Sequence, residues 1–157
     1  MHGSKSSRRE FGMTLVELIC SVAIMIVLTM VALPMARIRI KRERERQLHA
    51  ALTEMRSAID RYKDASDRGL IQVKLGSEGY PPDLETLVKG VDMVGQVDKK
   101  FRFLRRIPMD PITHSTEWGM RSMQDDPKST TFGGQNVFDV FTKSQDKALD
   151  GTSYSEW

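Results

Sequence analysis

Residues 12–36 read GMTLVELICSVAIMIVLTMVALPMA, and they form the longest apolar stretch of the chain. From Met13 to Ala36 there are 24 residues, and Glu17 is the only charged one among them. As an α-helix, a stretch of this length spans about 36 Å, whereas the hydrocarbon core of a bilayer is about 30 Å thick. The stretch therefore predicts a membrane-spanning helix. A carboxylate is costly in lipid unless it finds a partner, so Glu17 is a candidate functional residue.

Three ordinary explanations of the apolar stretch compete. A secretory signal peptide has a shorter apolar region, of about 7–15 residues, and a small-residue cleavage site that residues 33–37 match poorly. A twin-arginine signal accounts for Arg8 and Arg9 but not for Glu17. A plain signal anchor fits the length and again leaves the glutamate unexplained.

The size and composition of the chain limit what the rest can be. The chain has 157 residues, enough for one small domain behind a long helix. Residues 66–157 can bury only a modest core, so we do not expect a large enzyme with a deep active site. The single cysteine, Cys20, lies in the apolar stretch and excludes an intrachain disulfide. We interpret Cys20 as a small lipid-compatible residue, with palmitoylation as the alternative.

A short basic leader, residues 1–12, precedes Met13-Thr14-Leu15-Val16-Glu17. This arrangement resembles the processing site of type IV pilins and of the pseudopilins of type II secretion systems. The resemblance implies that a prepilin peptidase cuts between Gly12 and Met13 on the cytoplasmic side and that Met13 is then N-methylated. The family usually has Phe at this first mature position. Pro34 falls where many members carry a proline that kinks the helix.

The same resemblance implies a role for Glu17, which becomes the fifth residue after the cut. Cleavage leaves a positive amine on Met13. In the family, the glutamate is thought to neutralise the amine of a neighbouring subunit as that subunit enters the filament. Two charges that are costly alone in lipid become tolerable when they are paired. The alternative is that Glu17 only reaches out to the membrane interface.

A basic cluster follows the apolar stretch. The flank downstream of the apolar stretch carries more Lys and Arg than the leader upstream of it. The positive-inside rule alone would therefore place the C-terminal part in the cytoplasm, which conflicts with the pilin-like topology. We expect the cluster to meet lipid phosphates or to lie between subunits. Nucleic-acid binding is not expected, because no aromatic residues are interleaved. The cluster consists of Arg37, Arg39, Lys41, Arg42, Arg44 and Arg46, and Glu43 and Glu45 are the only acidic residues within it.

The helical pattern continues past the membrane-spanning stretch. Apolar residues spaced 4, 3, 4 and 3 apart form one stripe on an otherwise charged helix, which predicts packing against a small head. No Gly or Pro interrupts the sequence between Met35 and Arg68, and Gly69 is a plausible stop. The stripe consists of Leu48, Leu52, Met55, Ile59 and Tyr62.

The remaining residues predict short elements joined by turns. We expect a loop at 79–83 followed by a short helix at 84–88, a rigid turn at 107–111, strands at 117–123 and 137–143, and a loop at 124–135. The predicted fold class is therefore α+β, with a long N-terminal helix packed on a small antiparallel sheet. The loop at 79–81, the turn at 107–111 and Phe138-Asp139-Val140-Phe141 also resemble the head of the major pseudopilins. This predicts a leader at 1–12, a polymerising helix half at 13–36, an amphipathic half at 37–65 and a pilin-like head at 66–157.

The sequence shows no catalytic constellation. His2, His49 and His114 are scattered, and no triad signature or phosphate-binding glycine loop is present. We therefore do not expect an enzyme.

One candidate metal site lies in the tail, residues 144–152. Calcium takes several carboxylate and carbonyl oxygens from a tight loop. The resemblance to major pseudopilins, which carry a calcium loop after their last strands, assigns Asp146 and Asp150 as ligands. Lys147 adds a positive charge beside the site. The alternative is a polar Asp-Gly turn without an ion.

Together these patterns predict a filament subunit, most similar to the major pseudopilin that supports protein export by type II secretion. The alternatives are a type IV pilus pilin for adhesion, motility or DNA uptake, and a non-polymerising membrane-anchored binding module. The expected partners are other copies of the chain, the prepilin peptidase, an inner-membrane assembly platform with minor pseudopilins, and membrane lipid. The expected location is the bacterial inner membrane, with the head in the periplasm.

Overall fold

The computed structural model describes residues 14–95 and 99–157, with the backbone alone for residues 31–34. The chain divides into two compact units, Met1–Ile40 and Lys41–Trp157. The predicted processing site, Gly12 and Met13, lies outside the described residues.

One long helix, α1 (Leu15–Asp67), runs from the first unit into the second. The helix assignment continues through Pro34 without a break, and a kink at this proline stays a prediction. The helix ends as expected at Gly69, which has a positive φ of 67°. Leu70 N–H donates to the Ala65 carbonyl and Gly69 N–H to the Ser66 carbonyl, both at 2.9 Å. This is the Schellman arrangement, which satisfies carbonyls that the helix end leaves free.

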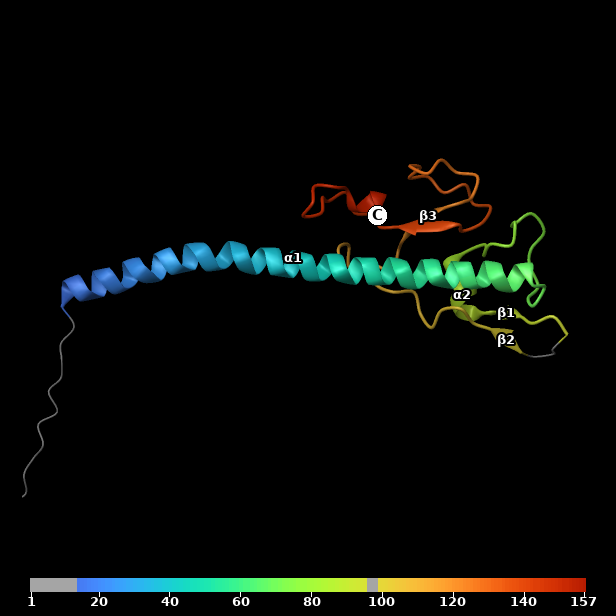
Figure 1. The fold of residues 1–157 in the computed structure, drawn as a ribbon, viewed down its shortest axis with the longest axis horizontal. Coiled ribbons are helices and arrows are strands. Elements are labelled where there is room, and N and C mark those ends of the chain that lie inside the picture. Colours follow the sequence, from blue (N-terminus) through green and yellow to red (C-terminus); the bar gives the residue numbers. More distant parts are fainter. Residues whose placement is uncertain (1–13, 96–98) are drawn as a thin grey trace, which may run out of the picture. The chain divides into compact units, whose positions relative to one another are not determined.

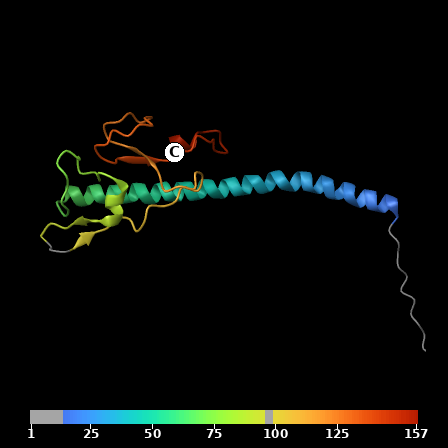
Figure 2. The ribbon, with the colours of Figure 1, turned by 180° about the vertical axis from the view of Figure 1, so that it is seen from behind.

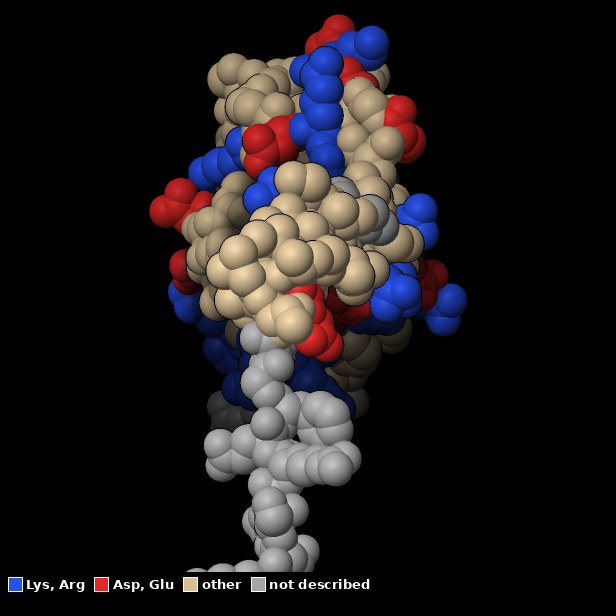
Figure 3. Space-filling view, turned by 90° about the vertical axis from the view of Figure 1, so that its left-hand side faces the viewer, with Lys and Arg blue, Asp and Glu red and all other residues tan. Residues whose placement is uncertain are grey.

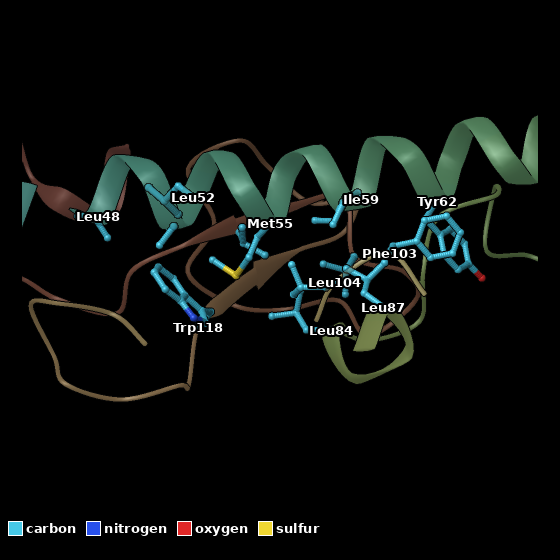
Figure 4. Packing of buried hydrophobic residues seen from close by; sticks show 14 of the residues in the cluster. Leu48, Leu52, Met55, Ile59, Tyr62, Leu84, Leu87, Phe103, Leu104 and Trp118 are labelled. Atoms are coloured by element: carbon cyan, nitrogen blue, oxygen red, sulfur yellow. The ribbon is translucent and has the colours of Figure 1, made fainter. Parts of the chain in front are cut away.

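The predicted apolar stripe of α1 forms the core of the second unit, which confirms that prediction. Figure 4 shows Leu48, Leu52, Met55, Ile59 and Tyr62 pointing from α1 toward side chains of the head. Each of the five is at most 2% exposed. Three alanines at a seven-residue spacing lie among them and are also buried, so loops of the head can approach the helix backbone. The alanines are Ala51, Ala58 and Ala65, and the head residues labelled in Figure 4 are Leu84, Leu87, Phe103, Leu104 and Trp118.

The short helix α2 (Leu84–Lys89) lies where the sequence predicts it. The carboxylate of Asp83 accepts a hydrogen bond from Thr86 N–H at 2.7 Å and thereby caps the first turn. Leu84 and Leu87 are buried in the core, so α2 covers part of the stripe of α1.

Two antiparallel two-stranded sheets complete the head. Strand β1 (Val91–Asp92) pairs with β2 (Lys100–Phe101), and β3 (Gly119–Arg121) pairs with β4 (Asp139–Phe141). The fold class α+β is therefore confirmed at the level of one long helix with small antiparallel sheets. The strands β3 and β4 are shorter than the predicted ranges, and β1 and β2 were not expected, because strands of two residues leave no alternation to read in a sequence.

Figures 1 and 2 show how these elements surround the second half of α1. In both views α2, β1 and β2 are drawn on one side of this half, and β3 with the C-terminal segment on the other. The last element is the 3₁₀-helix η1 (Tyr154–Glu156), which brings the C-terminal residues onto the head.

A charged network holds β4, α1 and the C-terminus together. Asp139 accepts from Arg56 Nε at 2.7 Å and from Arg121 Nη1 at 3.3 Å. The guanidinium of Arg56 also donates to the Trp157 carbonyl at 2.6 Å, and that of Arg121 to the Ser155 carbonyl at 3.2 Å. One carboxylate therefore joins a residue of the long helix to a residue of β3, and both arginines hold the last residues of the chain.

Candidate functional site

The first candidate site is the apolar surface of α1 in the first unit. Figure 3 looks onto the start of α1, and the described surface that faces the viewer there is covered mostly by uncharged side chains. The large apolar side chains on this half lie all around the helix, and each of them is between 48% and 75% exposed. Monomeric soluble proteins rarely expose so much contiguous apolar surface, which is typical of contact with lipid or with a partner. These residues are Leu15, Val16, Leu18, Ile19, Val22, Ile24, Met25, Ile26, Val27, Leu28 and Met30.

Two hydroxyl side chains within this surface, those of Ser21 and Thr29, are satisfied by the helix itself. Ser21 Oγ donates to the Glu17 carbonyl at 2.8 Å, and Thr29 Oγ1 donates to the Met25 carbonyl at 2.7 Å. Such bonds to the carbonyl four residues earlier remove the cost of placing a hydroxyl in lipid. By length and composition, α1 is able to cross a membrane, and the most apolar part of this helix is not buried inside the protein.

Glu17 lies in the first turn of α1, and Thr14 is the N-cap. Thr14 Oγ1 accepts a hydrogen bond from Glu17 N–H at 3.3 Å, and the Thr14 carbonyl accepts one from Leu18 N–H at 3.1 Å. Thr14-Leu15-Val16-Glu17 has the spacing of a capping box, in which a Ser or Thr is followed three residues later by Glu or Gln. The carboxylate also faces the positive end of the helix dipole. The cap at Thr14 was not predicted from the sequence, although the Thr-x-x-Glu spacing is a signal for it.

The carboxylate of Glu17 forms no ion pair with a cation of residues 14–95 or 99–157. Its predicted partner, the amine of Met13 on another copy, lies outside the described residues. Capping accounts for a Glu or a Gln at this position, but the charge itself is used by nothing else in the described part of the chain.

The basic cluster contains two residues that differ from the rest. Lys41 and Glu45 are half-buried, whereas Arg42, Glu43 and Arg44 between them are exposed. Lys41 and Glu45 are one helical turn apart, so they lie on the same face of α1 as the start of the apolar stripe. Both contact the tail that contains the candidate metal site.

The tail forms a small turn rather than an open loop. Ala148 N–H donates to the Thr152 carbonyl at 2.8 Å, and Gly151 N–H donates to the Ala148 carbonyl at 3.1 Å. Gly151 has a positive φ of 90°, which glycine adopts without strain. The carboxylate of Asp150 accepts from Thr152 Oγ1 at 2.7 Å and from Thr152 N–H at 2.9 Å, and these bonds lower its pKa.

The oxygens of this turn do not fit a calcium cage, which needs six to eight oxygen ligands. Among the residues that the structure describes, no place gathers three or more His, Cys, Asp or Glu side chains that could hold a metal. The carboxylate of Asp150 is already bonded to Thr152. Four carbonyls of the tail also accept protein donors: Asp146 from Tyr154 N–H, Lys147 from Lys41 Nζ, Ala148 from Gly151 N–H and Thr152 from Ala148 N–H.

The histidines have different surroundings. The ring of His49 stacks on that of Trp157, with centroids 4.1 Å apart and planes 15° apart. His114, just after the predicted turn at 107–111, has a positive φ of 55°, and its N–H donates to the Asp110 carbonyl at 2.9 Å. His2 lies outside the described residues.

Comparison of the chain with protein-family models, with curated proteins and with solved structures finds no match.

Proposed function

We propose that this chain is the structural subunit of a pilus-like filament, of the kind that a major pseudopilin forms to support protein export by type II secretion. The observation that carries the proposal is the first half of α1. It combines an exposed apolar surface with a single carboxylate in the first turn. A helix that served only as an anchor has no use for a charge at this depth, whereas a helix that packs against copies of itself does.

The proposed assembly mechanism is charge pairing between subunits. Cleavage after Gly12 leaves the amine of Met13 one helical turn from Glu17. In the membrane, the amine and carboxylate of different copies neutralise each other as a new subunit enters the filament. The apolar surfaces of adjacent helices then pack together, and the heads of the subunits lie outside the membrane.

The proposed partners follow from this life cycle. A prepilin peptidase removes the leader and N-methylates Met13, and an inner-membrane platform with minor pseudopilins receives the processed chain. The head lies in the periplasm and has no enzymatic role. A type IV pilus pilin uses the same helix, and the length of the native filament, seen by electron microscopy, separates the two kinds of filament.

The decisive variant is Glu17→Gln. A capping box accepts Gln in place of Glu, so this change keeps the helix cap and removes only the charge. The matched control is Thr14→Ala, which removes the cap, at a typical cost of about 1 kcal/mol, and keeps the charge. Filaments are counted by electron microscopy, and the mass of the chain is measured in the same preparations.

We expect Glu17→Gln to be processed to a chain that begins at N-methylated Met13 but to form few or no filaments. We expect Thr14→Ala to assemble nearly normally. Normal filaments from Glu17→Gln would refute charge pairing. An absence of self-association in the unmodified chain would instead identify a membrane-anchored binding module, and an uncut leader would refute the proposed processing.

A further inference from the structure

We propose that Lys41 and Glu45 of α1 bind the C-terminal loop, residues 144–157, in the role that a bound metal ion would otherwise have. The inference concerns the second unit alone, Lys41–Trp157, and does not rest on filament assembly. It follows from the misfit between the loop and a calcium cage, together with the contacts that the loop makes instead.

The ammonium of Lys41 is the cation that meets the loop. Its Nζ donates to the Lys147 carbonyl at 2.6 Å, a short charge-assisted hydrogen bond. The same group lies 6.0 Å from the centre of the Tyr154 ring, within reach of a cation–π interaction. One positive charge therefore contacts both strands of the small turn, since Lys147 and Ser153 form a bridge across it.

The carboxylate of Glu45 holds the loop one turn further along α1. Its Oε1 accepts from Leu149 N–H at 2.8 Å and from the Tyr154 hydroxyl at 2.9 Å. Leu149 belongs to the tip of the turn, and Tyr154 is buried at the start of η1. Glu45 thus joins the tip of the turn, at Leu149, to the start of η1, at Tyr154.

These two residues supply what calcium supplies in a loop of this kind. A calcium ion draws carbonyl oxygens together by its charge. Here a tethered ammonium attracts a carbonyl, and a tethered carboxylate satisfies an amide and a hydroxyl. Because both groups belong to α1, the order of the loop does not depend on the concentration of a free ion. The positive charge of Lys41 also opposes the entry of a second cation.

The experiment measures hydrogen exchange of the segment 144–157 by mass spectrometry, in the full chain in detergent micelles after treatment with a chelator. Exchange is compared with and without millimolar calcium. It is then measured in Lys41→Met, which keeps an unbranched apolar side chain, and in Glu45→Ala. The matched controls are Arg42→Met and Glu43→Ala, because Arg42 and Glu43 are exposed on the same stretch of α1.

We expect calcium to leave the exchange of the unmodified chain unchanged. We expect Lys41→Met and Glu45→Ala each to accelerate exchange in this segment by roughly tenfold or more, the size of effect that the loss of a hydrogen bond to a charged group gives. Exchange in α2 serves as the internal reference for folding. Slower exchange with calcium, or wild-type exchange in both variants, would overturn the proposal.

Discussion

Tyr154 shows at the scale of a single residue how the tail is tied to α1. It is 2% exposed, and its hydroxyl donates to Glu45. Burial is the main cause that raises its pKa from 10.0 to about 12, followed by the hydrogen bond to Glu45 and the charges of Glu45, Asp146 and Asp150. The neutral hydroxyl is therefore the form that the folded chain prefers.

This preference predicts how stability depends on alkaline pH. In the unfolded chain Tyr154 ionises near pH 10, and in the folded chain near pH 12. Its contribution to the free energy of unfolding is complete below pH 10 and is lost as the pH rises from 10 to 12. Burial, together with the charge of Asp83, also raises the pKa of Tyr62, so part of the decline has a second source.

The variant Tyr154→Phe separates the two tyrosines. We expect thermal unfolding of this variant to decline less between pH 10 and 12 than that of the unmodified chain. A spectroscopic titration of tyrosinate should lose the group that ionises near 12, leaving two of the three tyrosines. An unchanged titration curve would show that Tyr154 is not the buried hydroxyl.

At the scale of an element, the pair β3–β4 depends on one close contact. Gly119 lies opposite Phe141 in the register, and the ring of Phe141 occupies the space where a Cβ of residue 119 would stand. A Cβ there would lie 2.4 Å from the ring. On β3, two residues after Gly119, the guanidinium of Arg121 lies 4.0 Å from the centre of the Phe141 ring. The ring therefore packs flat over the strand between a glycine and an arginine.

We expect Gly119→Ala to destabilise the head by about 1–3 kcal/mol, because the ring must leave its position to admit a methyl group. Chemical denaturation of the full chain measures this change. The double variant Gly119→Ala/Phe141→Leu is the control, since a smaller side chain at 141 leaves room for the methyl group. The two substitutions should therefore be less harmful together than the sum of their separate effects. If the destabilisation by the double variant equalled the sum of the two single effects, the Phe141 ring would not be what excludes a side chain at residue 119.

A second link between elements is buried and polar. Asp110, in the predicted turn at 107–111, is 0% exposed and accepts hydrogen bonds from Ile112 N–H at 2.8 Å and from the Thr142 hydroxyl. The indole of Trp118 donates to the Pro108 carbonyl at 2.9 Å. This rigid turn is therefore fastened to the end of β4, and not merely a connection between elements.

At the scale of the whole molecule, two features of the sequence make opposite predictions about which side of the membrane carries the head. The basic cluster predicts a cytoplasmic head, and the processing motif predicts a periplasmic one. The contacts of Lys41 weaken the first prediction slightly, because its ammonium binds the Lys147 carbonyl of the head and is not free to bind lipid phosphates. The exposed arginines of the cluster still oppose the proposed orientation.

Cysteine labelling decides this orientation. Leu75 is 99% exposed in a turn of the head, so Leu75→Cys in a Cys20→Ser background places one accessible thiol there. We expect a membrane-impermeant maleimide to label this thiol in spheroplasts without detergent. The unmodified chain is the control, because Cys20 lies in the apolar segment and should stay unlabelled. Labelling of Leu75→Cys only after lysis would place the head in the cytoplasm and contradict the proposed topology.

Local patterns in the sequence determined the positions of the main elements. The apolar stretch at 13–36 and the stripe from Leu48 to Tyr62 predict α1, because burial of one helix face imposes a spacing of three and four residues. Gly69 and the Asp83 cap mark the ends of the two α-helices for equally local reasons. The single carboxylate at Glu17 is visible in the sequence as well, whereas the hydrogen bond from Glu17 N–H to the Thr14 hydroxyl is seen only in the structure.

The tertiary structure alone decided what the charged residues do. Lys41 contacts Lys147 across 106 positions of the chain, and Glu45 contacts Tyr154 across 109. In the sequence both look like their exposed neighbours, since charge and helical spacing do not say which loop will meet which face. That choice is made by the packing of the whole head around the stripe of α1. The packing half-buries these two charges, supplies their partners and leaves the other charges of the cluster in solvent.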